Sequence, residues 1–420
     1  MGAGVGFAVA ACIEVRPFRG DAGSDSATSC TPDFSVNGPA TLTWTADGPG
    51  GTVTGPSYVV HFANDPSKFH FPDIVQIGGI NFVGEDSRNE CNNEEEVGMA
   101  LFPAAAIHAN GSATVGTNEL SVVPGWIGPA VTKVLVRWST VYTCGSITRT
   151  PGGFSQFTLF PDGRIYRHDR MSDDVSTTTS WGTCGCVTSG AAYVPTSFWS
   201  FLRAPFTTYY DADGTDHLIA DIFLTVGVQT MPGAATCLQG ASAQTIAAGW
   251  PDGIARLRLP ANETLAMVRD FDRTADPTMV HAFSYASPSV IVLGNGPTCT
   301  AANGGLARAT AAIRRNEALF VNSQVELPSV VDGIYGGPDA PDGPAGVAID
   351  AGSGATLTGT LSAGFAVWLK LSSPACDITV TKLPEPSGPY FTKQKVDEDE
   401  WVVWFRDELV SGQTIAINAK

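Results

Sequence analysis

Short runs of alternating apolar and polar residues recur along the chain, and Gly- and Pro-rich turns separate them. Alternation over about four to eight residues is typical of a β-strand with one buried face, because successive side chains point to opposite faces of a sheet. The longest run, residues 133–142, is rich in β-branched and aromatic residues and is long enough for a core strand. Further strands are predicted at residues 41–45, 57–62, 218–228, 279–285, 289–293 and 318–324.

The clearest local prediction is a β-hairpin over residues 154–168. Two alternating runs flank residues 161–163 (Pro-Asp-Gly), where Pro and Gly stand at positions that tight turns favour. Residues 194–203 and residues 305–316 could each hold a short helix. These patterns predict a mostly β protein with little helix, built as an antiparallel β-sandwich or as one large supersandwich.

A Pro- and Gly-rich stretch at residues 336–344 marks a predicted domain boundary. The strand candidates that follow it are short, as in small β-sandwiches. We therefore predict a large β-sandwich domain over residues 37–337 and a small C-terminal β-domain over residues 345–420. The alternative is a long loop at 338–344, with the last strands completing the main sheet, because linkers and functional loops share this composition. The later strand candidates are residues 356–361, 365–371, 377–382, 401–405 and 414–418.

Amino-acid composition and net charge limit the kinds of molecule that this protein is expected to bind. Of the 420 residues, 43% are hydrophobic and only 15% are charged. This charged fraction is below the usual value of about 25%, so long surface helices rich in Glu and Lys are not expected. The formal net charge of −17 argues against nucleic acid and against anionic membrane surfaces as partners. Phosphate binding needs clustered Lys and Arg.

The first residues of the chain point to export. Cys12 follows Val-Ala-Ala at 9–11 and an uncharged apolar stretch at 4–11. This segment resembles the lipobox of bacterial lipoproteins, in which a peptidase cuts before the cysteine and lipid is attached to it. The resemblance implies that Cys12 is lipidated and that residues 1–11 are the remnant of a signal peptide, here without its basic n-region. The small, polar residues 12–36 are then expected to form a flexible tether. The alternative is a short buried strand with a free cysteine.

Assigning Cys12 to lipid leaves eight cysteines, an even number that suits disulfides in an oxidising compartment. Their pairing cannot be deduced from the sequence. Cys184 and Cys186 are too close to bridge each other and are expected to pair with two other segments. A zinc site is the weaker alternative there, because the pair lacks CxxC spacing and has no nearby His pair. The eight are Cys30, Cys91, Cys144, Cys184, Cys186, Cys237, Cys299 and Cys376.

Asp211, Asp213 and Asp216 resemble the first half of a calcium-binding loop, because alternate residues on a tight loop supply several oxygens. An EF-hand is excluded, since the sixth position is Asp216 where Gly is required and the twelfth is Ile222 where Glu is required. The expected cofactor is therefore none or calcium, and the alternative is a solvated turn. Asp270 and Asp272 would face one side of a strand, as a glycosidase carboxylate pair could.

Tyr166, Arg167 and His168 lie at the predicted hairpin, and Arg137 lies in the longest predicted strand. Arg can neutralise a uronate carboxylate, and Tyr or His can remove the adjacent proton. Residues 133–170 resemble strands of the large β-sandwich domains found in polysaccharide lyases and mutarotase-like proteins. The resemblance implies a lyase-like site built from Tyr166, His168 and Arg137 or Arg167. The alternative is a structural hairpin with an exposed polar face.

Three functional hypotheses follow. The first is a disulfide-stabilised β-sandwich lipoprotein outside the cytoplasm, anchored to the bacterial envelope or secreted, that binds a glycan or an envelope component without catalysis. In this hypothesis the membrane is contacted only through the lipid anchor. The second is a polysaccharide lyase-like carbohydrate-active enzyme. The third is a structural or adhesion protein stiffened by disulfides.

Overall fold

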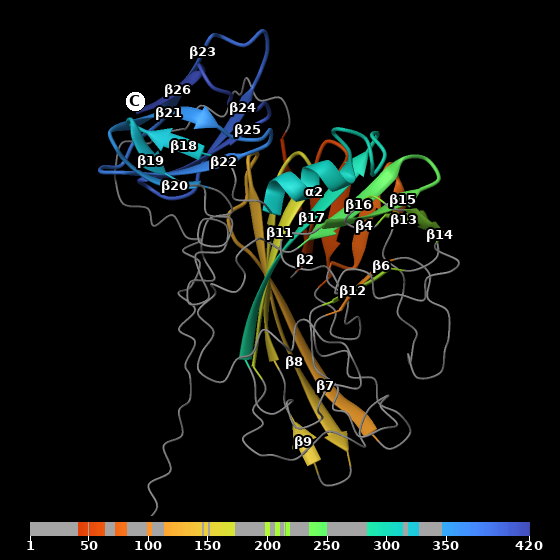
Figure 1. Ribbon diagram of the computed structural model, residues 1–420. Coiled ribbons are helices and arrows are strands. Elements are labelled where there is room, and N and C mark those ends of the chain that lie inside the picture. Colours follow the sequence, from red (N-terminus) through yellow and green to blue (C-terminus); the bar gives the residue numbers. More distant parts are fainter. Residues whose placement is uncertain are drawn as a thin grey trace, which may run out of the picture. The chain divides into compact units, whose positions relative to one another are not determined.

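The computed structural model describes fifteen stretches of the chain, all within the compact unit Thr31–Lys420. The protein is mostly β, as predicted, with several antiparallel sheets and one short helix among the described residues (Figure 1). The described residues are 41–48, 50–63, 72–81, 99–102, 113–144, 147–149, 152–172, 198–201, 206–210, 214, 216–218, 235–249, 284–313, 318–326 and 347–420.

The first sheet is an antiparallel meander of five short strands in sequence order. Its third strand alternates between buried and half-buried positions, so Tyr58, Val60 and Phe62 face the core while His61 faces outward. The sequence pattern at residues 57–62 predicted a strand here. The strands are β1 (Thr43–Asp47), β2 (Gly50–Thr54), β3 (Tyr58–Phe62), β4 (Ile74–Ile77) and β5 (Ile80–Asn81).

The second sheet has ten strands in the order β14-β13-β15-β16-β17-β11-β10-β8-β7, and β9 pairs with β8. A separate two-stranded sheet joins β6 (Met99–Phe102) to β12 (Phe198–Phe201). The strands of the large sheet are β7 (Ala113–Pro124), β8 (Thr132–Cys144), β9 (Ile147–Arg149), β10 (Gly152–Leu159), β11 (Arg164–Ser172), β13 (Phe206–Tyr210), β14 (Asp216–Leu218), β15 (Ala235–Gly240), β16 (Gln244–Gly249) and β17 (Ser284–Asn295).

The predicted hairpin is confirmed as β10 and β11, which pair from Leu159↔Ile165 outward. Gly163 closes the turn with φ of 87°, a left-handed conformation that glycine adopts without steric cost. The two helix predictions had different outcomes. The helix expected near residue 305 is α2 (Gly305–Ile313). Residues 194–203 instead contain β12, because Phe-Trp-Ser-Phe is a strand-forming sequence that pairs with β6.

The ten-stranded sheet is covered on both faces. On one face, Phe157 packs against Phe62 of the first sheet, with ring centroids 5.1 Å apart. On the other face, a buried cluster joins Tyr166 to Ala309 of α2 and to Trp404 near the C-terminus. The described part of the chain therefore has a layered, sandwich-like organisation with the large sheet between two other layers.

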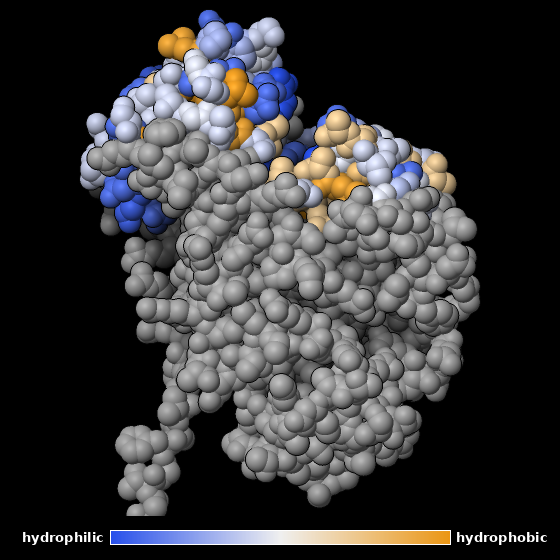
Figure 2. Space-filling model, in the orientation of Figure 1, coloured by the Kyte–Doolittle hydropathy of each residue, from blue (hydrophilic) through white to orange (hydrophobic). Residues whose placement is uncertain are grey.

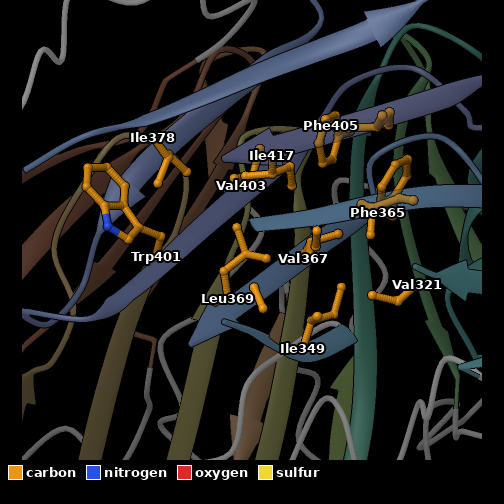
Figure 3. Packing of buried hydrophobic residues seen from close by; sticks show 14 of the residues in the cluster. Val321, Ile349, Phe365, Val367, Leu369, Ile378, Trp401, Val403, Phe405 and Ile417 are labelled. Atoms are coloured by element: carbon orange, nitrogen blue, oxygen red, sulfur yellow. The ribbon is translucent and has the colours of Figure 1, made fainter. Parts of the chain in front are cut away.

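The C-terminal strands form a second sandwich of two sheets, β19-β18-β21-β26-β23 and β20-β22-β25-β24. Figure 3 shows their side chains meeting in one core, with Val367, Val403 and Ile417 among the buried residues. The strands are β18 (Ala318–Val321), β19 (Gln324–Glu326), β20 (Val347–Gly352), β21 (Gly354–Thr360), β22 (Ala366–Leu371), β23 (Ile378–Leu383), β24 (Phe391–Lys395), β25 (Glu400–Phe405) and β26 (Thr414–Ala419).

This sandwich draws strands from both sides of residues 336–344. β18 pairs with β21, so the segment before the Pro- and Gly-rich stretch belongs to the same sheet as the C-terminal strands. The last strands form sheets of their own and do not complete the ten-stranded sheet. The exact domain boundaries stay a prediction.

The central strands β22 and β25 of the sheet β20-β22-β25-β24 contribute buried residues to the clusters on both faces of the sheet. Val403 and Phe405 of β25 face the sandwich core, whereas Val402 and Trp404 join the cluster on the large sheet. A buried hydrogen-bond acceptor reinforces this contact: Gln394 Oε1 accepts from the backbone N–H groups of Ala130 at 3.1 Å and Val131 at 3.0 Å. A strand buried on both faces needs a continuous apolar run, as β25 has, in place of alternation.

Candidate functional site

Tyr166, the central residue of the predicted lyase-like site, is part of the core. Its side chain is only 6% exposed and packs edge-on against Phe160, with ring centroids 5.8 Å apart. Its hydroxyl lies 3.5 Å from Nη1 of Arg164. This arrangement anchors the ring inside the protein and gives its hydroxyl a structural partner.

The other residues predicted for that site are placed by strand register. Tyr166 pairs with Thr158, and His168 pairs with Gln156. Arg137 pairs with Phe154, so its position lies on the same face of the sheet as those of Tyr166 and His168. Arg167 lies between the last two and therefore occupies a position on the opposite face. The register allows Arg137 and His168 to share a face, and it separates Arg167 from them; their catalytic roles stay predictions.

The proposed calcium ligands lie mostly outside the described residues, as do Asp270 and Asp272. Asp216 begins β14 and pairs with Tyr210 of β13, so the intervening residues connect two adjacent antiparallel strands. Gly214 adopts φ of 84° there, as tight turns often require. Within the described stretches, no group of three or more His, Cys, Asp or Glu side chains could hold a metal ion.

The prediction of disulfide bonds is confirmed for one pair of cysteines. Cys237 on β15 and Cys299, in the loop before α2, form a disulfide with a Cα–Cα distance of 5.8 Å. Both half-cystines are buried in the cluster beneath α2. Cys376 is also disulfide-bonded. Cys144 ends β8, and the other cysteines, Cys12, Cys30, Cys91, Cys184 and Cys186, lie outside the described residues.

A charged cluster caps the turn of the central hairpin. Arg164 Nε donates to Asp162 Oδ2 at 2.7 Å, and Arg308 of α2 donates to the carbonyl oxygens of Asp162 and of Leu293, the latter at 3.1 Å. Burial lowers the pKa of Arg308, the carboxylate of Asp162 opposes that shift, and the charge of Arg164 adds to it. Gly364 lies so close that a Cβ there would collide with Arg164. The cluster therefore ties the hairpin, the helix and a loop of the C-terminal sandwich together, which is a structural role.

The same turn is held from the first sheet by Tyr58. Its hydroxyl donates to the carbonyl oxygen of Phe160 at 2.8 Å. Burial raises the pKa of Tyr58 well above its ordinary value, and the negative charge of Asp162 adds to the shift. The phenol is therefore a neutral hydrogen-bond donor and not an acid that could take part in chemistry near neutral pH.

A second cluster lies on the outward face of the first sheet and was not predicted from the sequence. His61 stands between two carboxylates: its Nε2 donates to Asp47 Oδ2 at 2.6 Å, and its Nδ1 lies 2.7 Å from Asp73 Oδ1. The second contact is an ion-pair contact without hydrogen-bond alignment, and Asp73 Oδ1 also accepts the backbone N–H of Ala63 at 2.8 Å. The side chains of Asp47, His61 and Asp73 are 47%, 19% and 9% exposed.

No local pattern marks this cluster in the sequence. Asp47 ends one strand, His61 lies within a later strand, and Asp73 precedes another, so no spacing motif links them. The pairing of β1 with β2 and of β3 with β4 brings them together. The two carboxylates face different nitrogens of one imidazole ring, so the ring itself joins them.

The chain matches no protein-family model, and no curated protein is significantly similar to it. No helix among the described residues is long and apolar enough to cross a membrane.

Proposed function

We propose that this protein is an exported, disulfide-stabilised β-sandwich lipoprotein that binds a glycan or another cell-envelope component without transforming it. The observation that carries the export part of the proposal is the buried Cys237–Cys299 disulfide, accompanied by the bonded Cys376. Disulfides of this kind persist in oxidising compartments and are rare in the cytosol. The lipobox-like residues that end at Cys12 agree with this location.

Burial of Tyr166 favours binding over catalysis. A general base must reach the proton that it removes, within hydrogen-bond distance of a substrate. The ring of Tyr166 packs in the core, and burial raises the pKa of Tyr58, whose hydroxyl is bonded to the carbonyl oxygen of Phe160. Neither hydroxyl is thus suited to proton abstraction from a polymer.

Trp44 is a candidate stacking residue for a glycan. Its ring lies against Gly51 at the edge strand β1 and is half-buried, whereas Trp401 and Trp404 are fully enclosed in the core. Stacking of a sugar ring needs an aromatic face that stays accessible at one side.

Location is tested by intact-mass analysis of protein extracted from membranes. We expect a chain that begins at Cys12 and carries lipid, and we expect Cys12→Ser to abolish the lipid and release the protein from the membrane. A mature chain that retains Met1 or begins at Ile13 without lipid would contradict the lipoprotein assignment.

Binding is tested on a glycan array with the wild-type protein, Trp44→Ala and the control Ile127→Ala. Ile127 is exposed and apolar but is not an aromatic ring, so its substitution should leave glycan binding unchanged. Loss of binding in Trp44→Ala alone supports the proposal, and no binding to any glycan refutes the glycan assignment. Uronate polysaccharides are incubated with the same samples, and absorbance from unsaturated products would favour the lyase hypothesis instead.

A further inference from the structure

The strand β23 lies at the edge of its sheet, and side chains cover its open side. Among the described strands, β23 pairs with β26 alone. An edge strand presents a row of N–H and C=O groups that can pair with a strand of another molecule. What covers these groups therefore decides whether this edge can bind another chain.

The register with β26 identifies the backbone groups on the open side of β23. The N–H of Lys420 donates to the carbonyl oxygen of Asp377 at 2.8 Å, so the carbonyl group of Asp377 points toward the end of β26. In an antiparallel pair, successive residues turn their backbone groups alternately toward the partner strand and away from it. Ile378 and Val380 consequently turn their N–H and C=O groups toward the open side.

Three side chains form hydrogen bonds along this open side. Asp377 Oδ1 accepts the N–H of Ile378 at 2.8 Å, and Lys393 Nζ donates to the carbonyl oxygen of Ile378 at 2.9 Å. The hydroxyl of Tyr390 donates to the carbonyl oxygen of Val380 at 3.2 Å. Lys393 Nζ also lies 2.5 Å from Asp377 Oδ1, which links two of these side chains. A neighbouring strand would have to displace all three to pair with β23.

Two of these side chains come from the opposite sheet of the sandwich. Lys393 lies in β24, where Lys395, two residues further on, donates in the same way to the carbonyl oxygen of Ala375 at 2.9 Å. Tyr390 directly precedes β24, and burial raises the pKa of its hydroxyl, which therefore stays a donor at neutral pH. The side chains of Lys393 and Asp377 are only 15% and 16% exposed, so their ion pair is largely withdrawn from solvent.

We propose that Asp377, Tyr390 and Lys393 form an autoinhibitory edge cover, which keeps β23 from pairing with β23 of a second copy of this chain. A second copy is the partner that fits, because two identical edges can pair antiparallel about a two-fold axis, with each strand supplying donors and acceptors. The inference depends on neither glycan binding nor lipidation.

Apart from the edge cover, β23 is suited to pairing. Thr379 and Thr381 are exposed and β-branched, as strand residues often are. Leu383 ends the strand with a 58% exposed apolar side chain that a second copy would cover. Exposed charges commonly protect edge strands. The one charged residue of β23, Lys382, is instead 5% exposed and donates to the carbonyl oxygen of Glu408 at 2.7 Å. The edge cover is thus the feature that opposes pairing here.

The test is sedimentation velocity of the full, disulfide-intact chain that carries Asp377→Asn, Tyr390→Phe and Lys393→Met together. This combined variant removes both donors, retains a side-chain oxygen for the N–H of Ile378 and leaves the net charge unchanged. We expect its weight-average mass to rise with concentration to about twice that of the wild-type protein, because the uncovered edges pair.

The matched control removes a different pair of opposite charges from the same sandwich. Lys370→Met with Glu400→Gln takes away an ion pair of 3.6 Å on β22 and β25, and this variant should keep the wild-type mass. Amide hydrogen exchange of residues 378–383 should slow with concentration in the combined variant alone. Adding Thr381→Lys to that variant should restore the wild-type mass, because it places two like charges on one face of the paired strands.

A combined variant that keeps the wild-type mass at every concentration overturns the proposal. Association that leaves hydrogen exchange of residues 378–383 unchanged, or that persists with Thr381→Lys, overturns it as well. Tyr390→Phe alone retains every charged group and should raise the mass in the same direction by a smaller amount. If the combined variant does not fold, an unchanged mass of Tyr390→Phe decides against the edge cover.

Discussion

Gln394 offers a sharp test of how the C-terminal sandwich is attached to the large sheet. Its side chain is 2% exposed, and its Oε1 accepts hydrogen bonds from the backbone N–H groups of Ala130 and Val131, both 0% exposed. A Cβ on Gly128 would collide with the same amide group, so the backbone approaches Gln394 closely. The residue is thus a single acceptor that satisfies two buried donors.

Gln394→Met keeps the length and approximate volume of the side chain and removes the acceptor. Each buried donor left without a partner costs about 1–3 kcal/mol, so the free energy of unfolding should fall by about 2–6 kcal/mol. Most substitutions cost less, and a loss of this size would mark the contact as a major link between the two parts.

Urea-induced unfolding of the disulfide-intact protein measures this loss, with Gln413→Met as the matched control. Gln413 Oε1 accepts a hydrogen bond from Val410 at 3.3 Å in an exposed turn, where water can replace it. Its substitution should change the free energy of unfolding by less than about 0.5 kcal/mol. A Gln394→Met variant within about 0.5 kcal/mol of this control would show that the two donors find water or another acceptor, contrary to the reasoning.

Three further outcomes are expected. Replacing Cys237 and Cys299 together by Ala should cost about 4 kcal/mol in the free energy of unfolding, because the bond closes a loop with a sequence separation of 62; reductant should then have less effect on the melting temperature. Burial, and to a lesser extent the charge of Asp162, raises the pKa of Tyr58 in the folded protein. The free energy of unfolding should therefore fall as pH rises past about 10, where the phenol of the unfolded chain ionises and that of the folded protein does not. Tyr58→Phe should reduce this alkaline loss of melting temperature, and an undiminished loss would contradict the assignment. Phe405→Ala, in the sandwich core, should cost about 3–5 kcal/mol, whereas Leu383→Ala at a 58% exposed side chain should change stability little; equal losses in chemical denaturation would be inconsistent with the packing.

Local patterns predicted the strands well where one face of a strand is buried. Residues 154–168 alternate around a Pro-Asp-Gly turn and form the central hairpin. The C-terminal runs at 365–371 and 401–405 were recognised from their apolar content. Residues 194–203 were ambiguous because a short aromatic run fits either a helix or a strand, and pairing with β6 decided the outcome.

The site could not be predicted to the same extent. Tyr166 looked like a polar residue at the end of a hairpin, but the covering layer that carries Trp404 buries it. His61 looked isolated, because Asp47 and Asp73 reach it only through strand pairing. Burial and proximity of distant residues depend on how sheets stack, which spacing along the chain does not encode.

By itself, the sequence determined the β class, the position of most strands and the likeness of the N-terminal residues to a lipobox, because each is a property of neighbouring residues. The tertiary structure decided which polar residues became structural and which met at the surface. It joined Cys237 to Cys299, placed a third layer over the large sheet and brought two carboxylates to His61. These outcomes depend on long-range packing, in which residues far apart in the chain exclude water from one another.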